Sequence, residues 1–302
     1  MSVCARYCLR AAVLATVAIV ALLWTGDSFA LDWRRLHEQA DNTTYGQAKA
    51  AFVRRGNAEI VYVYALTCLN AYKDDEAQDI FTRLSAQEPN ESAYRWGLAE
   101  VERRKHQYAR CEGLLQEVLR EDPQFAPAYI SLAYLRYVQL DFAGSVRLAQ
   151  KVLTLGSGAV DKSNYVRAYL LAGGGKGMLA HYGGPIAKLI SGTQVLPNLK
   201  KAEALQPGSA GVLYGLGSYY LLAPALVGGD REKARLYLER ATAVDPLFAD
   251  AYVRLAQLYG MKGDRGRYDR YMAESLGIDP ENDLARDIIS KRCKFICPGA
   301  KQ

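Results

Sequence analysis

The residues that could carry out chemistry in this sequence are few, and the first candidate is the run Gly173-Gly174-Gly175-Lys176-Gly177. Glycines beside a lysine could hold a phosphate group. A phosphate loop, however, needs Ser or Thr directly after the lysine and a β-strand before the glycines. Gly177 follows Lys176, and residues 169–172 read as helix. We therefore expect no nucleotide site.

A hydrolytic or metal site is equally incomplete. Gly156-Ser157-Gly158 lacks the spacing of a nucleophile elbow, and the chain holds only three histidines. His181 is expected at a helix end and not as a general base. No HExxH, CxxC or paired-histidine motif is present. The sequence predicts a protein that is not an enzyme and that carries no cofactor and no metal.

Composition describes an ordinary globular chain. Of 302 residues, 50% are hydrophobic and 23% charged, which is enough for a sizeable core. The formal net charge is +6, and the basic residues are scattered among acidic ones. A nucleic-acid surface would need clustered lysine and arginine, so none is expected.

The N-terminus has the pattern of an export signal. Arg6 and Arg10 precede an apolar run at 11–24, and 28–30 places small residues where a signal peptidase reads them. The run would extend about 21 Å as a helix, short of the roughly 30 Å apolar core of a bilayer. We expect cleavage after Ala30 and a periplasmic or otherwise exported protein. An uncleaved signal anchor is the alternative, and membrane contact would then come through it or through partners.

The strongest pattern is a repeat of prolines. Pro89 and Pro123 are 34 residues apart, as are Pro246 and Pro280. A helix–turn–helix unit of 34 residues closed by proline is typical of the tetratricopeptide (TPR) repeat. Proline cannot continue a helix, so it ends the second helix of each unit.

The interior of each unit agrees with this register. Units that begin at residues 58, 92, 126 and 249 place a small residue at the eighth position, namely Ala65, Ala99, Ala133 and Ala256. Small residues there let the paired helices approach closely. The chain resembles the TPR family over most of 58–280, which implies an all-α, right-handed superhelical solenoid with an open groove lined by the first helix of each unit.

The predicted domain organisation follows from these observations. It is a cleaved signal peptide over 1–30, an N-terminal capping helix over 31–57, TPR repeats 1–3 over 58–158, a divergent helical repeat with glycine-rich loops over 159–211, TPR repeats with an insertion over 212–280, and a C-terminal cap or tail over 281–302.

The insertion is the most individual segment of the chain. Pro207 and Pro246 are 39 residues apart, five more than one unit, and the insertion lies around Pro224-Ala225-Leu226-Val227-Gly228-Gly229-Asp230. Asp230 is a favourable N-cap for the next helix. The sequence favours a longer connection with a double-glycine turn; the alternative is that the apolar residues of this loop tuck into the solenoid or line a pocket.

Residues 212–246 resemble the TPR-containing partner subunit of tripartite ATP-independent periplasmic (TRAP) transporters. A helix, a proline and a Gly-Gly-Asp turn precede a helix rich in alanine and basic residues in both. The resemblance implies an extracytoplasmic solenoid that oligomerises and docks a solute-binding protein.

The expected function is a non-catalytic scaffold for protein partners in the cell envelope. It would be either a TRAP-associated subunit or an envelope-assembly or secretion adaptor that binds peptides in its groove. Tyrosines at groove positions suit a half-buried interface, although they also fill consensus packing positions. The candidate binding residues are Tyr62, Trp96, Arg103, Tyr134, Tyr137, Tyr214, Pro224, Gly228, Gly229 and Asp230.

Four cysteines remain after the signal segment. Cys68 and Cys111 fall inside expected helices, where a buried, small apolar role is favoured. Cys293 and Cys297 are four residues apart, and an oxidising compartment would permit a disulfide between them.

Overall fold

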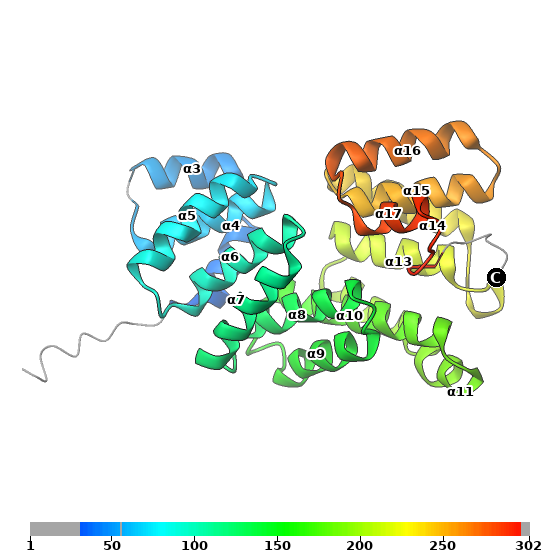
Figure 1. Ribbon diagram of the computed structural model, residues 1–302, viewed down its shortest axis with the longest axis horizontal. Coiled ribbons are helices and arrows are strands. Elements are labelled where there is room, and N and C mark those ends of the chain that lie inside the picture. Colours follow the sequence, from blue (N-terminus) through cyan, green and yellow to red (C-terminus); the bar gives the residue numbers. More distant parts are fainter. Residues whose placement is uncertain (1–30, 55, 297–302) are drawn as a thin grey trace, which may run out of the picture. The chain divides into compact units, whose positions relative to one another are not determined.

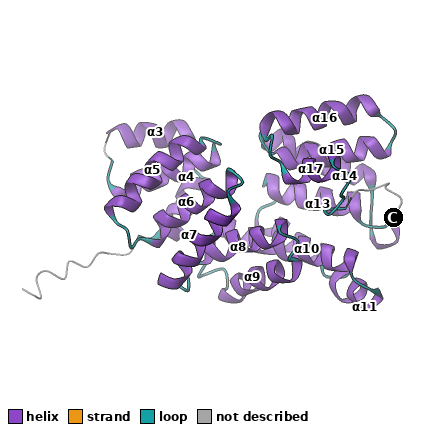
Figure 2. Cartoon of the chain, viewed as in Figure 1, coloured by secondary structure: helices purple, strands orange, loops and turns teal. Residues whose placement is uncertain are grey.

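The computed structural model describes residues 31–296, with the exception of residue 55. The helices belong to the unit Trp33–Gln302, which is distinct from Met1–Asp32. In the described residues every regular element is helical and no strand occurs (Figure 2). The predicted signal segment lies outside the described residues.

The helices repeat with the period that the prolines predict. Helices α4, α6 and α8 begin at residues 58, 92 and 126, and their partners α5, α7 and α9 begin at 74, 108 and 142, always 34 apart. The pairs are α4 (Ala58–Asn70) with α5 (Asp74–Gln87), α6 (Ser92–Arg104) with α7 (Tyr108–Glu121), α8 (Ala126–Val138) with α9 (Phe142–Leu155), and α15 (Ala249–Met261) with α16 (Arg265–Ile278). The all-α repeat fold is confirmed (Figure 1).

Small residues bring the two helices of each unit together. Ala65, Ala99 and Ala133 are fully buried. At Gly97 a Cβ atom would lie 2.2 Å from the ring of Phe81, so a larger residue would displace that ring. Close packing of this kind fixes the register along the chain.

Overpacking one of these sites should therefore destabilise the repeat array. Ala133 packs with Ala149 and Ala172 in a buried cluster. We expect Ala133→Leu to lower the free energy of unfolding by about 1–3 kcal/mol, because the extra methylenes have no space. Urea denaturation followed by circular dichroism measures this. The matched change Ala273→Leu, at an exposed position of α16, should leave the midpoint unchanged; an equal effect at both sites would contradict the packing register.

Residues before the first repeat form two helices, α2 (Trp33–Asp41) and α3 (Tyr45–Arg54), where one capping helix was predicted. The break has a local cause. Thr44 and Gln47 form a reciprocal capping box, in which the Gln47 side chain accepts from the Thr44 N–H at 3.0 Å and the Thr44 hydroxyl accepts from the Gln47 N–H at 3.3 Å. This starts a new helix directly after Asn42 and Thr43.

Glycine-rich loops were predicted within 159–211, and this prediction is wrong for the main glycine cluster. The glycines at 173–175 and 177 lie within the helix α10 (Lys162–Tyr182). Their role is close packing. A Cβ at Gly175 would lie 2.7 Å from the Val146 side chain, and one at Gly173 would lie 3.3 Å from Leu199. The helical backbone is not strained at these glycines, and the absence of side chains lets the neighbouring helices approach.

The chain then continues through short and regular helices to the insertion. These are α11 (Pro185–Ala187), the π-helix η1 (Lys188–Gly192), α12 (Val195–Leu205) and α13 (Ala210–Leu222). The insertion contains a 3₁₀ turn, η2 (Ala225–Val227), and α14 (Arg231–Val244) follows it. Asp230 caps α14 as predicted, because its carboxylate accepts from the N–H groups of Glu232 and Lys233 at 3.0 Å.

The chain's last described helix is α17 (Asp283–Ile289), which begins 34 residues after α15 and packs against α15 and α16. A short segment, 291–296, follows it. Among the described residues no helix is both long and apolar enough to cross a bilayer.

Candidate functional site

The surface predicted to bind partners in the first two repeats is covered by α2. Tyr62 is 0% exposed and its hydroxyl lies 2.8 Å from His37 Nε2. Trp96 is 5% exposed, packs on the His37 ring at a centroid distance of 4.9 Å, and donates its indole N–H to Ser131 at 3.1 Å. Neither side chain therefore presents a surface to a partner in this structure.

Arg103 belongs to a buried charge cluster on helices α6, α8 and α10. Its guanidinium donates two bonds of 3.0–3.2 Å to Glu100 and lies 4.9 Å from the ring centroid of Tyr134. Arg167 lies 3.9 Å from the same carboxylate, and Ser131 donates to it. Burial alone would raise the pKa of Glu100, but the two arginines and the hydrogen bonds outweigh burial and hold the pKa at about 2.

Three predicted tyrosines from two repeats lie near one another, and each is half-buried. Tyr134 and Tyr137 of α8 both interact electrostatically with Tyr214 of α13 and with Asp250 of α15. Burial raises the pKa of all three phenols. Burial also raises the pKa of Asp250, although Asn282 donates to it at 2.7 Å. The sequence predicted that these tyrosines point into the groove, but not that they lie near one another.

Side chains of the early repeats form hydrogen bonds with side chains of the late repeats, and the spacing of residues in the sequence does not predict these contacts. Tyr72 donates to Asp245 at 2.7 Å, and His106 Nε2 lies 3.1 Å from Asp279 Oδ1. Tyr72 and His106 both occupy the fifteenth position of their unit with a left-handed backbone, at φ 57° and 56°. Non-glycine residues avoid that conformation unless the surroundings hold them in it. In the sequence, the aromatic side chain at the fifteenth position of each of these units was the signal that could have indicated these contacts.

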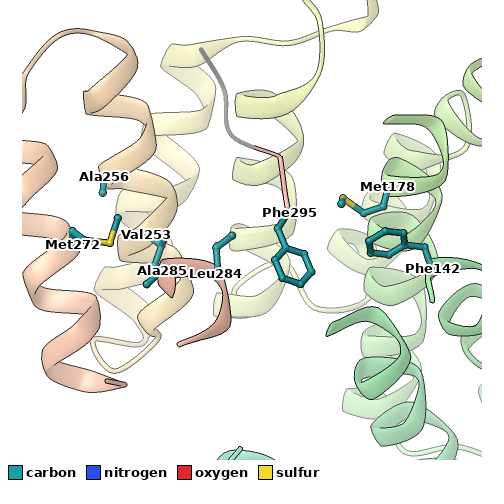
Figure 3. Packing of buried hydrophobic residues seen from close by; sticks show 8 residues of the cluster. All are labelled: Phe142, Met178, Val253, Ala256, Met272, Leu284, Ala285 and Phe295. Atoms are coloured by element: carbon teal, nitrogen blue, oxygen red, sulfur yellow. The ribbon is translucent and has the colours of Figure 1, made fainter. Parts of the chain in front are cut away.

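The late repeats are covered by the C-terminal segment. Phe295 is 8% exposed and lies in an apolar cluster that includes Phe142 and Met178 on one side and Val253 and Leu284 on the other (Figure 3). Its ring stacks on Tyr137 at a centroid distance of 5.9 Å. The expected groove is therefore filled by the chain itself at this position, and Phe295 was not among the predicted site residues.

The insertion is ordered and projects apolar side chains outward. Leu226 is 96% exposed and Val227 is 58% exposed, so the insertion is the longer connection with a double-glycine turn, and these residues do not tuck inward. The compact turn explains their exposure. Gly228 has φ 99°, and a Cβ at Gly229 would lie 1.9 Å from the Ala223 carbonyl oxygen, so the glycines close a turn too tight to fold the loop inward. Pro224 at its start is also exposed.

Lys176 and His181, which belong to the strings that suggested chemistry, both lie on α10. Lys176 lies in a cleft of about 340 Å³ between α9, α10 and α12, and donates to Gln194. Burial and the nearby charge of Lys201 lower the pKa of Lys176. Burial, with Lys188, lowers that of His181. No group of three or more possible metal ligands occurs within the described part of the chain.

The cysteines fall into two kinds. Cys68 and Cys111 are free and fully buried, and burial raises the pKa of each thiol to about 12. Such thiols are inert at neutral pH. Cys293 is disulfide-bonded. Cys297 lies outside the described residues, so the pairing of Cys293 with Cys297 stays a prediction.

Comparison with solved structures identifies helical-repeat proteins. A chain of the Cut9–Hcn1 hetero-tetramer of the APC/C matches 89% of this chain and 49% of its own length, at 16% identity and a TM-score of 0.57. Human IFIT1, solved as a dimer with m7Gppp-AAAA, matches 73% and 50%, at 17% identity and 0.55. YrrB, a TPR protein with an unusual peptide-binding site, matches 70% and 97%, at 19% identity and 0.37. No family model and no curated protein sequence matches the chain.

These findings define the class of protein. The 34-residue spacing of the helices and the likeness in fold to Cut9 and IFIT1 agree. The chain is an all-helical solenoid of TPR-type repeats. It spans about half the length of those two larger proteins.

Proposed function

We propose that this protein is an exported, non-catalytic scaffold that binds a protein partner in the cell envelope. The observation that carries the proposal is the exposed apolar tip of the insertion, Leu226 and Val227, on a turn closed by main-chain hydrogen bonds. Exposed apolar side chains grouped on a surface mark contact sites between proteins. The export signal predicted from the sequence of residues 1–30 supports the proposed location.

The finer proposal is a subunit associated with a TRAP-type transporter. It is supported by the resemblance of residues 212–246, which include the exposed tip, to the TPR-containing partner subunits of those transporters. The partner would be a solute-binding protein, and the scaffold would form oligomers. Further exposed apolar residues, Ile186 and Leu189, lie in the α11–η1 region and add contact surface.

A second candidate is an envelope-assembly or secretion adaptor that binds a peptide segment. The observation that favours it is the apolar cluster around Phe295, where a non-helical piece of the chain already packs between repeats. In this function the cluster, and not the insertion, would contact the partner.

Crosslinking and co-purification from the cell envelope test the proposal, with Leu226→Ser as the informative variant. We expect Leu226→Ser to reduce the crosslinked partner several-fold while stability stays within about 0.5 kcal/mol, because an exposed side chain contributes little to folding. Valine at Gly228 or Gly229 would be a poorer test, since both glycines are needed to close the turn.

The matched control is Val53→Ser, which removes another exposed apolar side chain, in α3. It should leave the partner unchanged. Recovery of transporter subunits would support the TRAP assignment. Equal crosslinking by the wild type and Leu226→Ser would contradict a role for the insertion, and the absence of any partner would overturn the scaffold function.

A further inference from the structure

We propose that residues 185–192, with the lysines beside them, form a surface that docks on an anionic phospholipid membrane. The apolar side chains of this segment would enter the interface of the bilayer, and the lysines would contact lipid phosphates. The inference goes beyond the proposed scaffold function, because it gives the protein a lipid contact of its own that needs neither the N-terminal segment nor a protein partner.

The segment exposes a group of aliphatic side chains. Ile186, Leu189 and Ile190 are 74%, 69% and 59% exposed. No other stretch of five residues in the described part of the chain holds three exposed large apolar side chains. Residues three and four apart lie on the same face of a helix, so these three side chains form one surface, the apolar ridge. A surface of this kind indicates contact with a protein or a membrane.

The apolar ridge belongs to an outer part of the fold. Helix α11 packs on η1, and η1 packs on α10. Figure 1 shows α11 at the end of α10. Neither α11 nor η1 contributes a buried residue to the core. The aliphatic side chains of the ridge therefore do not stabilise the solenoid, and they are available to another surface.

The charge around the ridge is positive. Residues 162–202 contain six lysines and arginines and no acidic residue, which leaves 32 basic and 32 acidic residues in the rest of the chain. The whole formal net charge of +6 therefore comes from this segment. Within it, the ion pairs among the described residues involve only Arg167, which lies 3.9 Å from Glu100, and Lys200, which lies 2.7 Å from Glu203.

Three of the lysines without an ion pair lie in the ridge segment or beside it. Lys188 is the first residue of η1. Lys176 and Lys201 line the cleft of about 340 Å³ between α9, α10 and α12. The cleft adjoins the ridge segment, since Gln194, two residues after the end of η1, also lines the cleft and accepts a hydrogen bond from Lys176. Apolar and basic side chains are thus combined at one edge of the molecule.

The positive charges of this surface act on one another. Burial and the charge of Lys201 lower the pKa of Lys176, and burial with the charge of Lys188 lowers the pKa of His181. An anion bound beside these groups would relieve the repulsion between them. The surface therefore complements a negatively charged partner.

The combination of charge and apolar area selects a lipid surface among the anionic partners. An anionic membrane presents phosphates beside an apolar layer, which matches lysines beside an aliphatic ridge. A second copy of the chain would bring the same positive charge and be repelled. A nucleic acid would contact the lysines but would leave the aliphatic side chains in water.

Sedimentation of the full chain with lipid vesicles tests the proposal. We expect vesicles that contain about one third phosphatidylglycerol to bind the protein at least about tenfold more tightly than vesicles of phosphatidylcholine alone, since each lysine adds about fivefold. About 1 M salt should remove most of this preference, because it screens the charges. Residues 11–24 are apolar but are the same in every variant, so a difference between variants reports the ridge and its lysines.

The first variant removes the apolar contact. Ile186→Ser combined with Leu189→Ser should weaken binding to the anionic vesicles about tenfold or more, because two aliphatic side chains no longer leave water. The matched control is Val53→Ser combined with Leu226→Ser, which removes two exposed apolar side chains elsewhere. The control should bind like the wild type; an equal loss in both double variants would overturn the assignment of the ridge.

The second variant removes one charge. Lys201→Gln should weaken binding to the anionic vesicles about fivefold and leave binding to neutral vesicles unchanged. The matched control is Lys262→Gln, at an exposed lysine directly after α15, which should bind like the wild type. The same loss for both lysines would mean that net charge, and not this surface, attracts the protein.

Hydrogen exchange gives a readout that attachment through the N-terminus cannot hide. On anionic vesicles the amides of residues 185–192 should exchange at least about fivefold more slowly than in solution, while those of α5 stay unchanged. Unchanged exchange over 185–192 would overturn the proposal. Slow exchange without vesicles that Ile186→Ser with Leu189→Ser abolishes would assign the ridge to a second copy of the chain and would also overturn it.

The same variants separate the lipid contact from the scaffold function. If Leu226→Ser loses the crosslinked protein partner and keeps its vesicle binding, both proposals stand on separate surfaces. If Ile186→Ser with Leu189→Ser loses the protein partner and keeps its vesicle binding, the ridge is a protein contact and the lipid proposal is wrong.

Discussion

Replacement of Glu100 by alanine is expected to destabilise the protein by about 3–5 kcal/mol, the cost of leaving a buried charge without its partner. Glu100 is 5% exposed and receives bonds from Arg103 and Ser131, with Arg167 at 3.9 Å. Without the carboxylate, two partly buried arginines would face each other. Urea denaturation at neutral pH should show a lower midpoint.

The matched control is Glu274→Ala, which removes a carboxylate 4.0 Å from Arg270 on the exposed face of α16. It should cost less than about 1 kcal/mol, because exposed ion pairs contribute little. The pH dependence gives a second check. The pKa of Glu100 is lowered to about 2 from 4.5, so its contribution is complete above pH 4.5 and is lost as the pH falls toward 2. The difference between wild type and Glu100→Ala should shrink over that window; a constant difference would contradict the ion cluster.

The repeat architecture was predictable because its determinants are local. Proline ends each second helix, and a small residue at the eighth position allows each pair to close. These signals depend on neighbours within a single unit. The prolines and the small residues correctly placed the helix pairs of 58–155 and 249–278. Asp230 was correctly predicted as an N-cap from its own residue type and position.

The covering of the groove was not predictable because it depends on contacts between distant segments. Position counting points Tyr62 and Trp96 inward, and they do point inward, but α2 lies over them. A short helix with no repeat pattern gives no signal of where it will pack. Residues 291–296 are likewise too few to show periodicity.

The glycines of α10 were also misread because their role depends on contacts between distant segments. A cluster of glycines is usually read as a loop because glycine weakens an isolated helix. Here tertiary packing outweighs that preference, since Val146 and Leu199 occupy the space that side chains would need. The insertion is the longer connection with a double-glycine turn that the sequence offered as one interpretation, and the other, in which its apolar residues tuck inward or line a pocket, is wrong for Leu226 and Val227.

The contact between His106 and the last repeats should make stability fall as the pH rises above neutrality. The hydrogen bond to Asp279 and the carboxylate of Asp283, 3.7 Å from Nδ1, raise the pKa of His106 from 6.5 to about 9, against the opposing effect of burial. A raised pKa stabilises the fold fully below pH 6.5, and this contribution is lost as the pH rises through about 9. The loss should reach up to about 3 kcal/mol, measured by urea denaturation at intervals between pH 6 and 9.5.

His106→Asn isolates this contribution, because asparagine tolerates the left-handed backbone at φ 56° but does not titrate. The variant should be less stable than the wild type at pH 6 and nearly equal to it at pH 9.5. His181→Gln, at the end of α10, should retain the slope of the wild type. Because His106 lies on the second repeat while Asp279 and Asp283 lie beyond α16, a flat profile in the wild type would mean that the early and late repeats are not joined by this charge pair.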